Sequence, residues 1–310
     1  KCIGIDIGGI SVKLGIFEED GTLVKKWEVP TRKEEDGKYI LGDIAASIRR
    51  TVKESRLELS DFSGAGMGFP GPVLPDGHCE VCVNLGWKAG NPQQELSRLL
   101  DGMVVKSGND ANVAALGEMW QGGGKGYKNL VMVTLGTGVG GGIILNEKIW
   151  TGEQGVGGEI GHIHVMEGEK EACNCGGHGC LEQVASATGI ARTARRMLAA
   201  DNRPSTLRSL KNISAKNVLD AAKAGDALAL ESLNKSCYYL GWALATISMV
   251  LDPQAFLIGG GVSKAGTFLT DIIKRYHDEL SPMATKKADI VLAKLGNDAG
   301  IYGAAKLIIG

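Results

Sequence analysis

Three cysteines and a histidine in the middle of the chain could hold a metal ion. Cys173, Cys175 and Cys180 fall within eight residues, and His162 lies eleven residues before the first of them. Thiolate sulfur and imidazole nitrogen are ligands that Zn²⁺ prefers, and a closed set of four protein ligands is typical of a structural site. The loop 162–180 is therefore predicted to bind structural zinc. Free thiols, a disulfide, or His164 in place of His162 are the alternatives.

Two glutamates flank this cluster. Glu159 stands three residues before His162, and Glu182 stands two residues after Cys180. A bound metal would hold both carboxylates and the imidazole in one rigid group. Because such a group offers several hydrogen-bonding atoms, it suits a ligand that carries many hydroxyls.

Two glycine-rich turns between apolar strands could bind phosphate. The segment that starts at Thr134 can be laid over the segment that starts at Asp6 without gaps, which indicates an internal duplication. Glycines allow backbone N–H groups to approach a phosphate closely, and the Asp6 carboxylate could hold Mg²⁺. A plain hairpin is the alternative for the first turn. A dinucleotide-binding loop is disfavoured for the second, because a strand rather than a helix follows it.

A carboxylate at the end of a predicted strand is a candidate base. Asn109 and Asp110 follow the strand 103–106 and precede a predicted helix, 113–121. Open α/β sheets bind ligands at the carboxyl ends of their strands, and a helix N-terminus favours an ionised Asp. The alternative is that one of the two residues is an ordinary helix N-cap.

Alternating strands and amphipathic helices must position these residues. Strands are expected at 2–9, 12–17, 23–29, from 64 towards 73, at 103–106, on both sides of the second turn within 130–145, and at 255–258 and 289–292. Helices are expected at 41–57, 91–100, 113–121, 188–200, 214–224, 226–251 and 299–309. Cys79 and Cys82 lie in a run that resembles a strand, where residues three apart would point to opposite faces. His277 is expected on a helix surface.

Composition limits the function classes. The chain has 310 residues, enough for two domains, and its net charge of −1 provides no field for nucleic acid or an acidic membrane. No run of eighteen apolar residues predicts a membrane span, and no signal peptide is recognised before the first strand. Seven cysteines, three of them in a metal pattern, fit a reducing cytoplasm.

Three motifs carry a family resemblance. They are Leu135-Gly-Thr-Gly-Val-Gly-Gly-Gly142, Gly158-Glu-Ile-Gly-His162 and the Cys-x-Cys-x₄-Cys-x-Glu run that ends at Glu182. Together they resemble the ROK family of repressors, open-reading-frame proteins and sugar kinases, and within it the bacterial glucokinases; the resemblance covers nearly the whole chain. It implies an α/β fold of two lobes, of the actin-like sugar-kinase (ribonuclease H-like) class, with the active site in a cleft between duplicated lobes. The expected lobes are 1–117 with a return helix at 299–310, and 118–298 with the zinc-binding loop.

The same resemblance implies a reaction and its residues. The expected reaction is transfer of phosphate from ATP to the 6-hydroxyl of a hexose, with glucose as the first expectation. Asp110 would be the catalytic base, and the sugar-binding residues would be Gly68, Asn84, Asn109, Asp110, Glu159, His162 and Glu182. The nucleotide and Mg²⁺ would meet Asp6, Gly8, Gly9, Ser11, Lys13, Gly136, Thr137, Gly138, Gly260 and Gly261. A homodimer or a dimer-based homo-oligomer is expected by the same comparison.

One residue departs from the family pattern. A Thr normally follows the two glycines of the first turn, whereas this chain has Ile10 there, followed by Ser11. The change removes a hydroxyl expected to contact phosphate, so a sugar-binding protein without activity stays open. Kinases for fructose, mannose, allose or an N-acetylhexosamine also stay open. A repressor is disfavoured, because family repressors place a DNA-binding domain before the first turn, which here starts at Asp6.

Overall fold

The computed structural model describes residues 1–80 and 82–310, and its contacts divide the chain into two compact units. Unit 1 comprises Lys1–Lys128, Gly142–Gly157 and Leu295–Gly310, and unit 2 comprises Asn129–Gly141 and Gly158–Lys294. Both units are discontinuous in sequence, since the C-terminal segment returns to unit 1. The expected lobe boundaries after residues 117 and 298 remain predictions.

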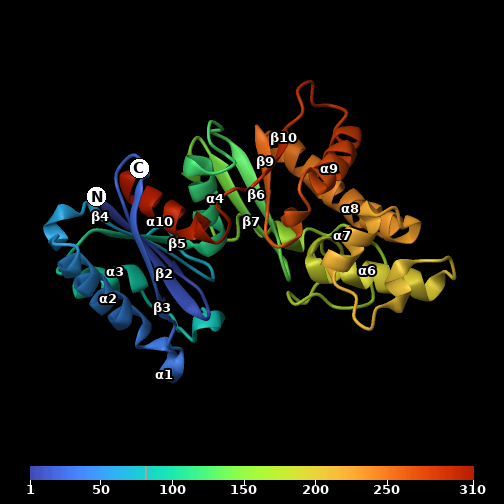
Figure 1. Ribbon diagram of the computed structural model, residues 1–310. Helices are drawn as coiled ribbons and strands as arrows, with labels where there is room; N and C mark the ends of the chain where they lie inside the picture. Colours follow the sequence, from blue (N-terminus) through green and yellow to red (C-terminus); the bar gives the residue numbers. More distant parts are fainter. Residues whose placement is uncertain (81) are drawn as a thin grey trace. The chain divides into compact units, whose positions relative to one another are not determined.

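A five-stranded mixed sheet forms the centre of unit 1 (Figure 1). Its strand order is β3-β2-β1-β4-β5, in which β1 pairs antiparallel with β2 and parallel with β4. The strands are β1 (Cys2–Ile7), β2 (Ser11–Phe17), β3 (Leu23–Pro30), β4 (Gly64–Phe69) and β5 (Val105–Asn109). The helices of this unit are α1 (Glu34–Gly37), α2 (Ile40–Glu54), α3 (Pro92–Leu99), α4 (Asp110–Gln121) and α10 (Ala299–Ile309), with 3₁₀ turns η1 (Leu59–Asp61), η2 (Val83–Leu85) and η6 (Gly296–Asp298).

The two faces of this sheet bury different residues of β1. Ile3, Ile5 and Ile7 belong to the core that also contains the buried face of α2. Cys2 points to the other face, where it packs with Ile301 of α10. This alternation is the ordinary consequence of a strand's period of two. Asp6 has the same parity as Cys2, so its carboxylate lies on the α10 side.

Glycines let α10 approach the sheet and α4 closely. A Cβ atom added at Gly66 would overlap the carbonyl of Ala304, and one at Gly303 would overlap the carbonyl of Val113. These positions therefore require glycine, because any side chain would push the helix away. Figure 1 shows α10, in red, beside the blue N-terminal strands, so the two ends of the chain meet in unit 1.

The second sheet has the same strand topology as the first. Its order is β10-β9-β6-β7-β8, in which β6 and β9 are parallel, β9 and β10 are parallel, and β7 and β8 are antiparallel. Its strands are β6 (Leu130–Leu135), β7 (Val139–Leu145), β8 (Lys148–Ile149), β9 (Ala255–Gly259) and β10 (Asp289–Leu292). In this order β6 takes the place of β1. The strands β7 and β8 lie on one side of it, as β2 and β3 lie beside β1, and β9 and β10 lie on the other, as β4 and β5 do. The chain passes from unit 2 to unit 1 within β7, after Gly141.

The duplicated strands agree in detail. β1 and β6 both have six residues and the same burial pattern, with a half-buried fifth residue, Asp6 or Thr134. Both are followed by a three-residue turn and a seven-residue strand. The predicted duplication and the α/β fold class are therefore confirmed.

Helices cover the rest of unit 2. They are α5 (Glu182–Ala185), α6 (Ala187–Ala200), α7 (Ala215–Lys223), α8 (Ala227–Leu251) and α9 (Thr267–Leu280), with 3₁₀ turns η3 (Ile160–His162), η4 (Thr206–Ser209) and η5 (Val262–Ala265). In the part of the chain that the structure describes, none of the helices combines the length and apolar character needed to cross a membrane.

Two local expectations are wrong. Cys79 and Cys82 do not alternate across a strand: each makes an isolated bridge, to Gly90 and Trp87, and both are buried in one core. Val81, between them, lies outside the described residues. His277 is fully buried instead of exposed, and its ring bonds to Ser248 Oγ at 2.9 Å and packs edge-on against Phe256.

Candidate active site

The first glycine turn follows β1 directly. The Gly8 N–H donates to the carbonyl of Ser11 at 3.0 Å, which closes the turn before β2 begins. Asp6 lies one residue before the end of β1, and its carboxylate is 3.9 Å from Lys13 Nζ. The pKa of Asp6 is raised to about 6: burial is the main cause, Lys13 opposes the rise, and the charge of Asp110 adds to it. The structure thus brings together the predicted residues of this turn.

Asp110 opens helix α4 at the end of β5. Burial raises the pKa of this carboxyl above its ordinary value, against the opposing effect of the Ala111 N–H and the Asn109 side chain. A Cβ atom added at Gly68, on the neighbouring strand, would lie 3.6 Å from Asp110 Cα. Asp110 is thus a half-buried carboxylate beside a strand position that has no side chain.

Asn109 is the N-cap of the same helix. Its Oδ1 accepts from the N–H groups of Ala111 and Asn112 at 3.0 and 3.2 Å, and its Nδ2 donates to the Gly71 carbonyl at 3.1 Å. The N-cap interpretation of Asn109 is therefore correct. These bonds also fix the loop after β4 to the first turn of α4, next to Asp110.

Asn84 comes close to the first turn from another part of unit 1. It is exposed in η2, and its carbonyl oxygen lies 3.9 Å from a Cβ atom built on Gly9. Lys33 Nζ lies at the same distance from that position. The sequence did not single out Lys33, since a lone lysine between a strand and a short helix has no distinguishing pattern.

The second glycine turn, Gly136–Gly138, follows β6. The Gly136 N–H donates to the Gly138 carbonyl at 3.0 Å. In the described part of the chain, the N–H groups of Thr137 and Gly138 donate to no protein acceptor. Free N–H groups that converge in a turn form an anion-binding site, so this turn retains donors for a phosphate.

The four predicted zinc ligands converge. One ligand atom from each of His162, Cys173, Cys175 and Cys180 lies within 4.8 Å of all the others. Cys175 Sγ and Cys180 Sγ are 3.6 Å apart, and Cys173 Sγ is 3.7 Å from His162 Nδ1. A tetrahedron with Zn–S bonds of about 2.3 Å has sulfur atoms about 3.8 Å apart. The donor set and its spacing therefore fit one Zn²⁺.

The two flanking glutamates lie differently around this cluster. Glu159 is exposed, and its Oε2 is 3.9 Å from His162 Nε2, the ring nitrogen that faces away from Cys173. Glu182 Oε2 accepts from the N–H of Val139 at 3.0 Å, and its Oε1 is 3.9 Å from Cys173 Sγ. His164 instead bonds to the His178 carbonyl and is not among the four converging residues.

A cavity in unit 2 lies beside the loop Gly260–Gly261. It measures about 410 Å³, and its lining includes Ala187, Gly261, Val262, the α7 N-cap Ser214 and residues of α7 as far as Lys223. Gly260 has a positive φ, and a Cβ atom there would overlap Leu135, just before the second turn. Ala187 donates its N–H to the Gly136 carbonyl at 2.8 Å. The cavity is thus adjacent to the second glycine turn.

The sequence did not predict the α7 side of this cavity. Ser214, Lys216, Asp220 and Lys223 line it from a helix whose polar face resembles any solvated surface. The capping box of Ser214 and Asn217 marks where α7 begins, and this is the one local signal that could have drawn attention to the segment.

Comparison with known proteins agrees with this architecture. The model of the ROK family matches residues 2–310. The chain is 41% identical to a glucokinase of Halalkalibacterium halodurans, over 99% of this chain and 94% of that protein. It is 36% identical to a glucokinase of Thermotoga maritima, over 99% and 97%. A ROK family glucokinase from Streptomyces griseus, solved in complex with glucose and AMPPNP, superposes with a TM-score of 0.75 at 32% identity and covers 99% of this chain and 98% of that chain.

Two five-stranded sheets with the same strand order, each with a glycine turn after its first strand, define the sugar-kinase fold class. The family match and the two full-length relatives make the assignment more particular: this chain belongs to the ROK family.

Proposed function

We propose that this protein transfers the γ-phosphoryl group of ATP to the 6-hydroxyl of glucose. The observation that carries the proposal is the placement of Asp110, a half-buried carboxylate at the end of β5 beside Gly68, in a chain similar over its whole length to named glucokinases. A base needs a pKa closer to the working pH than that of an ordinary Asp, and burial supplies this shift.

In the proposed reaction, Asp110 accepts the proton of the sugar 6-hydroxyl. The sugar oxygen forms a bond to the γ-phosphorus, the bond from that phosphorus to the bridging oxygen breaks, and ADP leaves with the bond's electron pair. Asn109, Glu159, His162 and Glu182 would bind the other hydroxyls, with Gly68 and Asn84 close to the sugar. A hydroxyl-binding group left unpaired by the wrong sugar costs about 1–3 kcal/mol, which would supply discrimination.

ATP would bind both to backbone N–H groups of the two glycine turns and to the cavity in unit 2. N–H groups of Gly8, Gly9, Gly136, Thr137 and Gly138 would contact the phosphates. The cavity beside Gly260 and Gly261 has space for a nucleoside, and its adjacency to the second turn supports that assignment. Ser11 and Lys13 complete the predicted set on the first turn.

Two metal ions are proposed with different tasks. Mg²⁺ prefers oxygen ligands; the half-buried Asp6 carboxylate would supply one, and the ion would offset phosphate charge. Zn²⁺ would be structural, since His162, Cys173, Cys175 and Cys180 fill a tetrahedron and leave no position for water. Its ligation through Nδ1 would leave His162 Nε2 available for a sugar hydroxyl.

A homodimer in the cytoplasm is also proposed. Tyr238, Trp242 and Met249 expose 40%, 42% and 62% of their surfaces along one side of α8, a stripe that suits burial against a second copy. Thiolates kept for a metal fit a reducing compartment. Sedimentation of the wild type and of Trp242→Arg would test the dimer: a wild-type monomer would refute it.

The activity is tested by ADP release with Mg-ATP and a panel of sugars. The panel is glucose, fructose, mannose, allose, N-acetylmannosamine and N-acetylglucosamine, and glucose 6-phosphate is measured by a coupled dehydrogenase. We expect the highest kcat/KM for glucose. A higher value for another sugar would reassign the substrate, and glucose binding without ADP release would show a sugar-binding protein without activity.

A further inference from the structure

One short segment, residues 180–188, joins the predicted zinc site to the second glycine turn. Glu182 accepts the N–H of Val139 at 3.0 Å, the Ala187 N–H donates to Gly136 O at 2.8 Å, and Thr188 Oγ1 donates to Thr137 O at 3.0 Å. All these residues belong to unit 2. The segment thus makes hydrogen bonds to Gly136, Thr137 and Val139. The Glu182 side chain also lies against Gly138.

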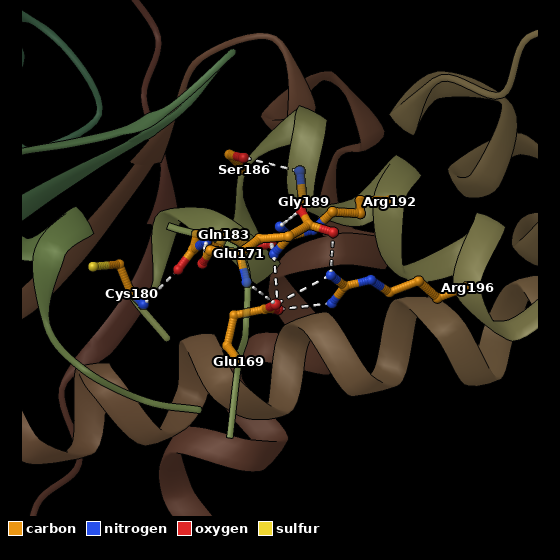
Figure 2. A network of polar contacts seen from close by, with 8 residues as sticks. All are labelled: Glu169, Glu171, Cys180, Gln183, Ser186, Gly189, Arg192 and Arg196. Atoms are coloured by element: carbon orange, nitrogen blue, oxygen red, sulfur yellow. Dashed lines mark hydrogen bonds and ion pairs between the residues drawn. The ribbon is translucent and has the colours of Figure 1, made fainter. Parts of the chain in front are cut away.

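The other end of this segment is fixed to the metal loop. Cys180 is one of the four converging ligands, and its N–H donates to Gln183 Oε1 at 3.1 Å. Gln183 also donates through Nε2 to the Glu171 carbonyl at 3.0 Å. Figure 2 shows Gln183 among these partners, with Ser186 capping α6 by accepting the Gly189 N–H.

Ion pairs hold the same loop against α6. Arg192 contacts Glu171 at 2.8 Å and donates to the Gln183 carbonyl at 2.6 Å, while Arg196 contacts Glu169 at 2.7 Å (Figure 2). The pKa of Glu169 falls to about 2, chiefly because of its hydrogen bond from Arg196. Ion pairs and hydrogen bonds therefore hold the metal loop to α6 on the side from which residues 180–188 leave it.

Glu182 is the side chain that meets both ends of this connection. Its Oε1 lies 3.9 Å from Cys173 Sγ, and its Oε2 holds the Val139 N–H. A Cβ atom added at Gly138 would overlap Oε2, whereas one added at Gly136 would meet nothing within 4 Å. The absence of a side chain at Gly138 is therefore what lets the carboxylate reach the turn.

We infer that Glu182 is a positioning residue for the phosphate donor, in addition to its proposed contact with the sugar. It fixes the conformation of the turn that carries the free N–H groups of Thr137 and Gly138, and it links that conformation to the state of the metal loop. The inference rests on the proposed binding of a nucleotide at this turn. On this inference the metal loop affects the binding of the nucleotide as well as that of the sugar. No sequence pattern indicated a link between the metal loop and the nucleotide.

The test measures the Kd of AMPPNP with Mg²⁺, by calorimetry without sugar, in Glu182→Ala and Glu182→Gln. Loss of the carboxylate should weaken nucleotide binding about 10-fold, the worth of one hydrogen bond to a charged group. The Gln variant should lose clearly less affinity than the Ala variant, because its neutral amide oxygen can still accept the Val139 N–H. Zinc per chain and the glucose Kd are measured in parallel.

A pair of glycine variants keeps the test decisive if Glu182→Ala loses its metal. Gly138→Ala should displace the carboxylate and weaken nucleotide binding by a similar factor. Adding Glu182→Ala to it should then cause no further loss, because both changes remove the same contact. Gly136→Ala places its methyl group in open space in the same turn. The effects of Gly136→Ala and Glu182→Ala on the free energy of nucleotide binding should therefore add.

The possible outcomes separate this inference from the proposed function. Wild-type nucleotide affinity in a zinc-replete Glu182→Ala protein would overturn the inference alone. So would equal losses in the Ala and Gln variants, or independent effects of Gly138→Ala and Glu182→Ala. A wild-type protein that binds no nucleotide would instead overturn the proposed function.

Discussion

The two glycine turns occupy equivalent positions in a duplicated fold, yet different parts of the chain support them. The first turn is held by Thr31, which follows β3 of the same sheet: its Oγ1 donates to Gly8 O at 2.7 Å and its N–H donates to Ile10 O at 2.9 Å. The second turn is held by residues 180–188, and the Val139 N–H finds its acceptor 43 residues along the chain.

The residues at the third position of each turn reflect this difference. Ile10 is 88% exposed, with its side chain in solvent. Gly138, its counterpart, must lack a side chain because the Glu182 carboxylate occupies that space. The two copies thus share strand and turn geometry, whereas only the second turn is hydrogen-bonded to the segment that leaves the predicted zinc loop.

The largest expected effect is the loss of turnover on replacing Asp110, which lies in the unit that contains the first turn. Asp110→Asn should lower turnover about 10²–10⁴-fold, the usual contribution of a positioned base, with glucose affinity and zinc content near wild type. Steady-state kinetics and isothermal titration with glucose measure both quantities. Turnover near the wild-type value would remove Asp110 from the role of base.

The same carboxyl predicts a dependence on pH. Because burial raises the pKa of Asp110, kcat/KM should fall about 10-fold for each pH unit below that pKa, starting at a higher pH than an ordinary Asp allows. The raised pKa also means that the ionised form destabilises the fold, an effect present at neutral pH and lost on acidification below the ordinary pKa. Asp110→Asn should therefore unfold at a higher temperature than the wild type at pH 7, and equal or lower Tm values there would contradict the shift.

Removal of one metal ligand should distinguish the two turns. Cys175→Ser should lower bound zinc below one per chain, reduce Tm, and weaken both glucose and AMPPNP binding, the latter about 10-fold. Thr31→Val is the matched change at the first turn: loss of one neutral hydrogen bond should weaken AMPPNP binding at most about 5-fold and leave zinc unchanged. Full zinc in Cys175→Ser would exclude the proposed ligand set.

The smallest effect is expected at Ile10. Its side chain is in solvent, so Ile10→Thr costs no packing, and it adds a hydroxyl where the family resemblance led us to expect one. The KM for ATP should fall, or turnover should rise, by a few-fold, about the worth of one weak hydrogen bond. If backbone N–H groups and Ser11 already suffice, neither value changes; a loss of activity would show that the first turn is misaligned with the family.

The spacing of residues within single segments predicted much of the fold and the four residues of the metal site. The helix predicted at 299–309 coincides with α10, and the four residues chosen for zinc converge. Both follow from patterns within one segment: apolar periodicity in one case, and three cysteines within eight residues in the other. The alignment of Thr134 with Asp6 succeeded for the same reason, since strand, turn and strand are contiguous.

Features that depend on tertiary contacts could not be predicted. His277 reads as a polar helix residue, yet Ser248 and Phe256 bury it from other elements. Cys79 and Cys82 share one core, and each forms an isolated bridge with a later residue instead of belonging to a regular strand. The second partner of Glu182, the Val139 N–H, is likewise supplied by distant chain, so the sequence indicated only its possible contact with sugar.

Hydrogen exchange at the two turns tests the central claim most directly, because Val139 N–H exchanges only when Glu182 releases it. We would compare peptides that contain residues 7–11 and 135–139 in wild type and in Cys175→Ser, under conditions where both proteins are folded. Faster exchange in the second peptide, with the first unchanged, is the result this account predicts. Unchanged exchange at 135–139 in a protein that has lost its zinc would contradict it.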